Sequence, residues 1–280
     1  MTVQEGPYAA WGRRIRISGS SWWSARTVEV PVATRQLQVV QSGERTNPAG
    51  KAVSNKILLS IPEEEYGFLR PHLEFIDLPN HCNLYEPGQT LRYVYFPNNG
   101  MISLVVPTED GKTVEAGVVG NEGMTGMAST VGLRRSPLRE VVQISGDGFR
   151  VTTTAFQRTL RSAPELSLAL NRYAVLQGLQ VAQTAACNRL HEIEQRLARW
   201  LLMVQDRIDE GMLMITHDFL ATMLGTDRPS VTVAAGTLQK RSLIEYTRGA
   251  VKIVNRKKLE GFVCECYGII QQFNGELGLR

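Results

Sequence analysis

The segment from Thr216 to Ile244 constrains this chain more than any other, because it predicts two short helices joined by a tight turn. The first helix has one apolar face at helical spacing, formed by Phe219, Leu220, Met223 and Leu224. Gly225 follows, the residue type best able to end a helix with a positive φ. Asp227 can then cap a second helix, and Pro229 suits its first turn, where a missing N–H costs no hydrogen bond.

The second predicted helix divides into an inner and an outer face. Its apolar positions have the spacing of a buried face: Val231, Ala234, Ala235 and Leu238. On or near the outer face are Arg228, Ser230, Thr232, Val233 and Gly236. Two helices in this layout can lay the second one in the major groove of DNA, where its outer face meets base edges. Any small helical hairpin shares the caps and the apolar face, so a purely structural interpretation stays open at this point.

A β-hairpin and a basic cluster follow the two helices. The segments Leu243–Tyr246 and Val251–Val254 flank Thr247-Arg248-Gly249, in which glycine supplies the turn. Two helices followed by such a hairpin form a winged helix-turn-helix. Between Arg228 and Lys258 there are eight Lys or Arg residues and one acid, Glu245. Phosphate binding depends on such local asymmetry, because displaced counterions supply much of the affinity. The pattern therefore favours nucleic-acid binding.

Composition places the protein among globular chains of the cytoplasm. It has 280 residues, 43% of them hydrophobic, and a formal net charge of +4. No apolar run approaches the ~20 residues of a membrane span, and the N-terminal arginines lack the apolar stretch of a secretory signal. The four cysteines form no plausible disulfide framework for a chain of this length, which suits a reducing compartment.

The cysteines also offer one weak indication of a metal site. Cys264-x-Cys266 could supply half of the ligands, and Cys187, His191 or His217 would have to supply the rest. No spacing of zinc-ligand type links these residues along the chain. We therefore predict no metal site, with the two cysteines on a short C-terminal helix.

The chain divides into five predicted segments. Residues 1–53 are rich in Gly, Ser, Thr and Gln and resemble a poorly ordered leader. Residues 54–163 contain many short β segments separated by turn residues, which indicates a sandwich or a double-sheet roll. Residues 164–190 form a long helix, 191–268 a DNA-binding unit and 269–280 a C-terminal tail.

The long helix has a heptad-like seam that continues into the next helix. Its positions are three and four residues apart: Leu176, Leu179, Gln183, Ala186, Leu190, Ile193, Leu197 and Trp200. Small residues near Ala182 would let a second helix approach closely. The seam favours pairing with a second copy of the chain, and packing against the chain's own β domain is the alternative; a helix of this length can do both.

This order of elements resembles the Crp/Fnr superfamily of bacterial transcription regulators, from about Lys56 to Tyr267. The motifs that carry the resemblance are Ile215–Asp218, Leu224-Gly225, Asp227-Arg228, Ser230-Val231, Leu238, Leu243-Ile244 and the Gly249 hairpin. The resemblance implies an α+β fold: a cyclic-nucleotide-binding-like β-roll as sensory domain, a dimerisation helix and a winged helix-turn-helix. It also implies that Thr216 touches phosphate and that Arg228 reads a guanine, worth roughly 1–3 kcal/mol of discrimination.

The recognition helix departs from the cyclic-AMP receptor at two places, which hold Pro229 and Val233 instead of a Glu and an Arg. Pro229 cannot accept from cytosine, and Val233 can make only an apolar contact, so a different operator is expected. Residues predicted at bases or the adjacent phosphates are Thr216, Arg228, Ser230, Thr232 and Val233. Residues predicted at the DNA backbone are Lys240, Arg241, Arg248 and Lys252.

The sensory half departs further from the family pattern. The counterpart of its phosphate cassette is a glycine-rich loop followed by an arginine, so the predicted effector pocket comprises Gly120, Glu122, Gly123, Gly126 and Arg139. Met127 aligns with the Glu that would hold the ribose, and a buried phosphate needs a matched Arg. Cyclic AMP is therefore not the expected effector. Only Cys82 precedes residue 187, which argues against an N-terminal iron–sulfur cluster. No cofactor is expected, although haem ligation by a histidine stays open.

Together these features predict a homodimeric, sequence-specific regulator whose partners are double-stranded DNA, a second copy and, as a candidate, RNA polymerase, without a membrane. The alternative is a small-molecule sensor that acts through a protein partner and keeps the helix-turn-helix for packing. An enzyme is not expected, because the chain has no GxSxG, P-loop or HExxH motif.

Overall fold

The computed structural model describes residues 40–208, 211–247 and 249–276, and two short helices come first among the helices of these residues. They are α1 (Lys56–Ser60) and α2 (Glu63–Leu69), and the 3₁₀ helix η1 (Arg70–His72) follows. Asn55 caps α1 by accepting from the Leu58 N–H. Its side-chain amide donates to the carbonyls of Pro97 at 2.9 Å and Gly123 at 2.7 Å, which fixes α1 on the strands that come next.

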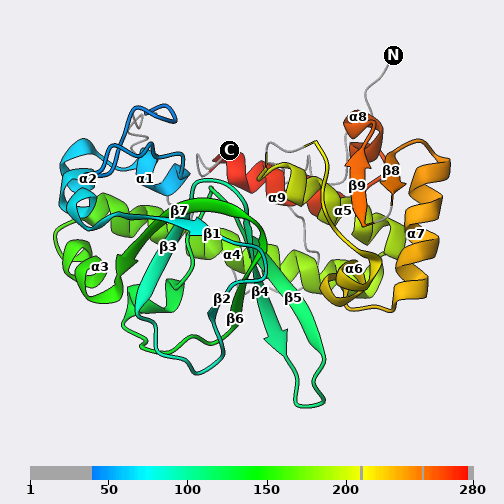
Figure 1. Cartoon of the computed structure of the whole chain (residues 1–280), viewed down its shortest axis with the longest axis horizontal. Coiled ribbons are helices and arrows are strands. Elements are labelled where there is room, and N and C mark those ends of the chain that lie inside the picture. The colour runs from blue at the N-terminus through cyan, green and yellow to red at the C-terminus, as the bar shows by residue number, and fades with distance from the viewer. Residues whose placement is uncertain (1–39, 209–210, 248, 277–280) are drawn as a thin grey trace, which may run out of the picture. The chain divides into compact units, whose positions relative to one another are not determined.

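Seven strands form two antiparallel sheets, as predicted for a double-sheet roll (Figure 1). One sheet has the order β1-β7-β3 and the other β2-β6-β4-β5. The strands are β1 (Glu74–Leu78), β2 (Asn83–Tyr85), β3 (Tyr93–Pro97), β4 (Met101–Pro107), β5 (Thr113–Val119), β6 (Arg139–Ile144) and β7 (Gly146–Thr152). A 3₁₀ helix, η2 (Met127–Val131), lies between β5 and β6.

The long helix α4 (Pro164–Leu190) follows α3 (Thr153–Leu160) and has the bounds predicted from the sequence. The Glu65 carboxylate of α2 accepts from the Glu165 and Leu166 N–H groups at 3.0 and 2.8 Å and so satisfies the first turn of α4. The core of the β-roll includes the apolar side chains of α4: Leu166, Leu170, Tyr173 and Leu176. Packing against the chain's own β domain, left open above, is therefore realised for one face of α4.

The C-terminal unit begins after an extended residue, His191, which ends α4. Its elements are α5 (Ile193–Gln205), α6 (His217–Leu224), α7 (Arg228–Lys240), β8 (Ile244–Thr247), β9 (Ala250–Ile253), α8 (Arg256–Glu260) and α9 (Glu265–Glu276). These elements share one core, which also contains Met101 of β4 and Val118 of β5. The helix-turn-helix unit thus packs directly on the β-roll. Every helix among the described residues is too short or too polar to span a lipid bilayer.

Two predicted boundaries are wrong. The leader was predicted to end at residue 53, but Arg45 is buried and donates to the carbonyls of Leu58 and Ile61, so the ordered fold starts earlier. The first 39 residues of that leader lie outside the described residues. Residues 269–276 of the predicted tail instead belong to α9, which contacts α4 and α5 and in which Ile270 and Asn274 are buried.

Candidate nucleic-acid interface

Local sequence fixes the ends of α6 and α7. Thr216 caps α6, its Oγ1 accepting from the Phe219 N–H at 3.2 Å. Gly225 ends that helix at φ 59°, a left-handed conformation that suits glycine. Asp227 then caps α7 by accepting from the Ser230 N–H at 2.8 Å. The Gly225 end and the Asp227 cap are the ones that the sequence predicts, whereas the capping role of Thr216 was not predicted.

One face of α7 is buried and the opposite face is open to solvent. The inner face consists of residues less than 3% exposed: Val231, Ala234, Ala235 and Leu238. On the outer face Val233 is 64% exposed, and Arg228 and Thr232 are exposed as well. An exposed valine on a cationic helix has no role in the core of the described fold. The surface is therefore available to a partner.

Arg228 forms an ion pair with Asp218 across the helix-turn-helix. Its Nη1 lies 3.2 Å from Oδ2 of Asp218, and the two side chains are 64% and 66% exposed. A pair this exposed contributes little free energy, because water screens it. The Arg228 guanidinium can therefore exchange this partner for a phosphate or a base at small cost.

His217 connects α6, α7 and the β8–β9 hairpin, which is the wing of the winged helix-turn-helix. Sequence reasoning missed this role. Its Nδ1 lies 2.9 Å from Oγ1 of Thr232, which donates to the Arg228 carbonyl, so Nδ1 must be the donor to Thr232. The imidazole also stacks on Tyr246 of β8, with 4.0 Å between ring centroids. Burial lowers the pKa of His217, and the charge of Arg228 lowers that pKa further.

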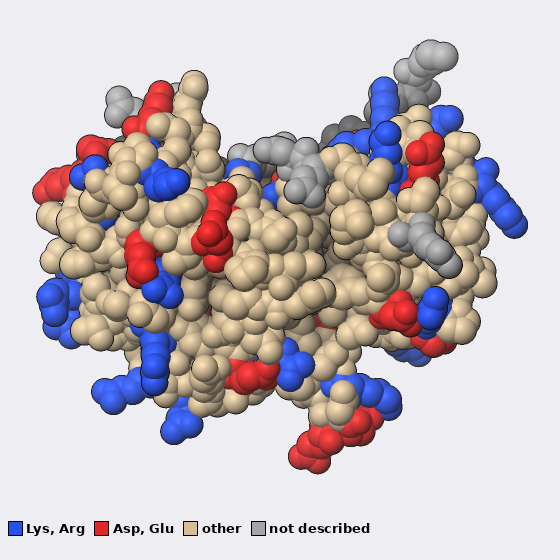
Figure 2. Space-filling view, viewed as in Figure 1, with Lys and Arg blue, Asp and Glu red and all other residues tan. Residues whose placement is uncertain are grey.

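Basic side chains continue the surface beyond α7. Figure 2 shows Lys and Arg gathered over α8 and along the edge beside α7, where Lys240, Lys257 and Lys258 are exposed. Lys252 is exposed on β9, and Arg241 lies over the Phe262 ring at 5.0 Å. By contrast, Arg256 is tied internally to Asp206 and Glu260. Arg248 lies outside the described residues.

The glycine-rich loop of the β-roll packs against helices. Arg207, in the turn that follows α5, donates from Nη2 and Nε to Oε1 of Glu122 at 2.7 and 2.9 Å, and both side chains are buried. A Cβ at Gly123 would lie 2.1 Å from the Tyr173 ring, so only glycine allows α4 to approach this loop. The cavity beside Glu122 measures about 10 Å³, room for a single water.

Two further residues of the predicted effector pocket have other surroundings. Arg139 pairs with Glu86 at 2.9 Å, on the side of β6 that is partly exposed. Gly126 has φ 76° and precedes η2, where it shapes a turn. Glu122 and Arg139 thus use separate partners, Arg207 and Glu86, in the described structure.

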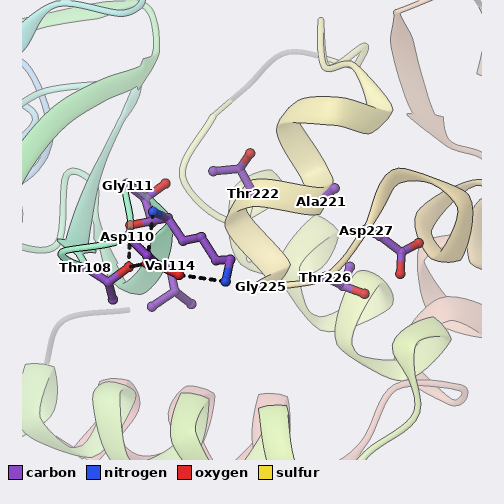
Figure 3. Close-up of a pocket in the computed structure, with 11 residues that line it drawn as sticks. Thr108, Asp110, Gly111, Val114, Ala221, Thr222, Gly225, Thr226 and Asp227 are labelled. Carbon is purple, nitrogen blue, oxygen red and sulfur yellow. Dashed lines mark hydrogen bonds and ion pairs between the residues drawn. The ribbon is translucent and has the colours of Figure 1, made fainter.

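A larger cleft lies between the β4–β5 hairpin and the helix-turn-helix. Its volume is about 680 Å³. Figure 3 shows the hairpin residues on one side and α6 with its following turn on the other: Thr108, Asp110, Gly111 and Val114 facing Ala221, Thr222, Gly225, Thr226 and Asp227. A Cβ at Gly225 would come within 3.2 Å of the Val114 side chain. The β-roll therefore reaches the turn that positions α7.

The fold also brings together four residues that the sequence separates. The ligand atoms of Cys187, His191, Cys264 and Cys266 all lie within 4.8 Å of one another. Their spacing along the chain does not match a zinc motif, so the sequence alone predicts no metal site here. That argument fails, since the contact of α4 with α9 joins residues 77 positions apart.

Comparison with known proteins agrees with this geometry. Residues 195–262 match the model of the Crp-like helix-turn-helix domain. FixK2 from Bradyrhizobium japonicum superposes with a TM-score of 0.59 at 14% identity, over 69% of this chain and 98% of FixK2. CLP from Xanthomonas campestris, a c-di-GMP responsive global regulator, has a TM-score of 0.58 at 14% identity, over 69% and 100% of the two chains.

A CRP-family regulator from Thermus thermophilus gives a TM-score of 0.54 at 19% identity, over 69% of this chain and 96% of that one. No curated protein matches the chain in a comparison of sequences. The chain therefore carries a Crp-like helix-turn-helix domain and has the fold of the Crp/Fnr transcription regulators.

Proposed function

We propose that this protein is a homodimeric transcription regulator that binds a specific DNA sequence through the outer face of α7. The observation that carries the proposal is the exposure of Arg228, Thr232 and Val233 on a helix whose other face is sealed in the core. A helix presented in this way fits the major groove, which is wide enough to admit it.

The chemistry of the outer face divides into readout and anchoring. Arg228 stands at the first position of α7 and can form two hydrogen bonds to a guanine. Val233 and Thr232 offer methyl groups that suit a thymine methyl. Thr216 at the start of α6, with Lys240, Arg241 and Lys252, would neutralise phosphates and set the register of the protein on the duplex. This division separates specificity from salt-dependent affinity.

The free face of α4 supports dimerisation. Small or short side chains recur about once per helical turn along its exposed side: Ala174, Val175, Gly178, Val181, Ala182 and Ala185. Such a face lets a second helix approach closely. It differs from the seam predicted above, of which Leu176 is buried in the chain's own core. A two-fold axis along α4 would present two copies of α7 to successive major grooves.

The β-roll is the sensory part in this proposal, and cyclic AMP is not its effector. Glu122 already pairs with Arg207 and Arg139 with Glu86, so both charged side chains of the predicted effector pocket have protein partners in the described structure. The contact of the β4–β5 hairpin with the turn before α7 supplies a route from the roll to the DNA-binding surface. A DNA-binding regulator of this kind would act in the cytoplasm, with RNA polymerase as a candidate partner.

Selection from a random pool of duplex DNA tests the proposed function. The purified full-length protein is mixed with the pool, and bound duplexes are recovered and sequenced through several rounds. We expect an enriched inverted repeat with half-site centres about 10 base pairs apart, because a two-fold dimer reads two faces of one turn. A pool without enriched sequences would overturn the proposal and favour the alternative sensor that acts through a protein partner.

A further inference from the structure

Three buried cysteines and one histidine converge where the end of α4 meets the start of α9. Cys187 lies in the last turn of α4, and His191 follows four positions later at its end. Cys264 directly precedes α9 and Cys266 is inside it. The three cysteines are free thiols, each no more than 3% exposed. The three thiols are therefore enclosed by the fold, and His191 is partly buried beside them.

The distances fit one tetrahedral ion. Sγ of Cys187 lies 3.6 Å from Sγ of Cys264, and Sγ of Cys266 lies 3.6 Å from Nδ1 of His191. A zinc ion at its usual bond lengths separates two sulfurs by about 3.8 Å and a sulfur from a nitrogen by about 3.6 Å. An iron–sulfur cluster holds its ligands around several metal atoms and spreads them further apart. Ligand atoms that all lie within 4.8 Å thus favour a single ion.

The histidine has the second partner that a metal ligand needs. Its Nδ1 faces Cys266, and its Nε2 lies 3.4 Å from Oε1 of Glu265. Metal-bound histidines usually direct their other ring nitrogen to a carboxylate, which fixes the ring orientation and raises the basicity of the ligand. Glu265 occupies that position here. Three cysteines packed only as small apolar groups would not require this arrangement.

A buried arginine lies beside the cluster, and its positive charge would be stabilised by a negative charge nearby. Arg199 of α5 is only 5% exposed, and its hydrogen bonds in the described structure go to neutral atoms, Oγ1 of Thr184 and Sδ of Met203. Its Nε has no partner there. Thr184 lies three residues before Cys187 on α4, so its contact with Arg199 places the guanidinium beside the cluster.

We infer that Cys187, His191, Cys264 and Cys266 bind one divalent zinc ion in a tetrahedral site. Three thiolates and a neutral imidazole around Zn²⁺ carry one net negative charge, which would balance the buried Arg199. The site joins α9 to the residue where α4 ends and the helix-turn-helix unit begins. The ion would therefore hold the junction between the long helix and the DNA-binding unit, with no vacant coordination position for catalysis.

Metal analysis and cobalt substitution of the full-length protein test this inference. The protein is purified under reducing conditions without added chelator, and its zinc content is measured by mass spectrometry. Zinc is then replaced by Co²⁺, whose thiolate charge-transfer and visible bands distinguish tetrahedral sulfur-rich sites. We expect about one zinc per chain and intense tetrahedral bands. Iron with acid-labile sulfide, or a weak octahedral cobalt spectrum, would overturn the assignment.

Matched cysteine variants locate the ion. Cys187→Ser and Cys264→Ser remove one ligand each, and Cys82→Ser changes a partly exposed cysteine outside the cluster. We expect the first two variants to bind Co²⁺ at least tenfold more weakly and to lose charge-transfer intensity, with no change in Cys82→Ser. Equal binding by all three variants would contradict the site. Circular dichroism of each variant shows that the chain is folded, so a loss of binding reports the ligand rather than the fold.

Discussion

Nε1 of Trp200 on α5 donates a 2.9 Å hydrogen bond to Oε1 of Glu115 on β5, and both residues are buried. Ser103 of β4 donates to the other carboxylate oxygen. This carboxyl group joins the β-roll to the helix-turn-helix unit. Burial raises the pKa of Glu115 from 4.5 to about 7, although both hydrogen bonds lower it. The joint between the two parts therefore contains a proton whose occupancy changes near neutral pH.

Replacing Glu115 by Gln should change how stability depends on pH. A carboxyl whose pKa is raised on folding stabilises the protein below its unfolded pKa, and this contribution is lost as pH rises through its folded pKa. Each pKa unit is worth about 1.4 kcal/mol, so the rise of the Glu115 pKa from 4.5 to about 7 corresponds to about 3 kcal/mol in the free energy of unfolding. Urea unfolding at several pH values from 5 to 8 measures this contribution.

As pH rises from 5 to 8, the free energy of unfolding of Glu115→Gln should increase by up to about 3 kcal/mol relative to that of the native chain. The reason is that glutamine never ionises. Glu140 has its pKa raised to about 7 by burial as well, so both proteins keep the pH dependence due to Glu140. The difference between the two proteins isolates Glu115. A difference that stays constant with pH would contradict the assigned titration.

Removing the acid of the Glu122–Arg207 pair should destabilise the fold strongly. Glu122→Ala leaves a buried guanidinium without its carboxylate, and such changes cost about 3–5 kcal/mol in the free energy of unfolding. Glu74→Ala is the matched control, since its pair with Arg150 is largely exposed and should contribute about 1 kcal/mol or less. The denaturant midpoints of the two variants measure their losses of stability. Similar losses would show that the buried Glu122–Arg207 pair is no more important to the fold than an exposed pair.

Much of this architecture follows from sequence patterns that act locally. Turn residues delimit strands such as β2, and the caps Thr216 and Asp227 with Gly225 delimit α6 and α7. Each depends on neighbours along the chain, so the order of elements and the outer face of α7 could be predicted. The helix that replaces the predicted tail escaped prediction because α9 packs on α4, which is distant in sequence.

Contacts between distant segments escaped prediction for the same reason. His217 stacks on Tyr246 only because the wing folds back on α6, and no local pattern encodes that contact. The sequence was equally ambiguous about which face of α4 is free for a second copy. Leu176 fits the predicted seam by its spacing, but it is buried in the core of the β-roll. The cysteine cluster required α9 to meet α4, which sequence spacing could not reveal.

A charge on the free face of α4 should weaken dimerisation. Val175 is 72% exposed there, and Val175→Asp would place a carboxylate between two closely packed helices. We expect at least a tenfold rise in the dimer dissociation constant by analytical ultracentrifugation, about 1.4 kcal/mol. Val131→Asp, at a valine 75% exposed on η2, is the control and should stay dimeric. Equal behaviour of the two variants would exclude this face of α4 as the interface.

Lys252 should contribute to affinity without contributing to specificity. It is exposed on β9 of the wing, where a phosphate contact would release about one counterion. Lys252→Ala should weaken binding similarly on selected and random DNA and reduce the slope of log affinity against log salt by about 1. Lys51→Ala, on the β-roll side of the chain, should leave that slope unchanged. If Lys252→Ala has the same salt dependence as the native protein, Lys252 does not contact the DNA backbone.

The ratio of affinities for the selected site and random DNA tests the role of α7 most directly. It is measured by fluorescence anisotropy at one salt concentration for the native protein, Arg228→Lys and Arg228→Ala. Lysine keeps the charge but lacks the planar fork, so we predict that both variants lose about 5- to 150-fold of this ratio, equivalent to 1–3 kcal/mol. Arg228→Lys should still bind random DNA with near-native affinity. An unchanged ratio in both variants would contradict direct reading of DNA by α7.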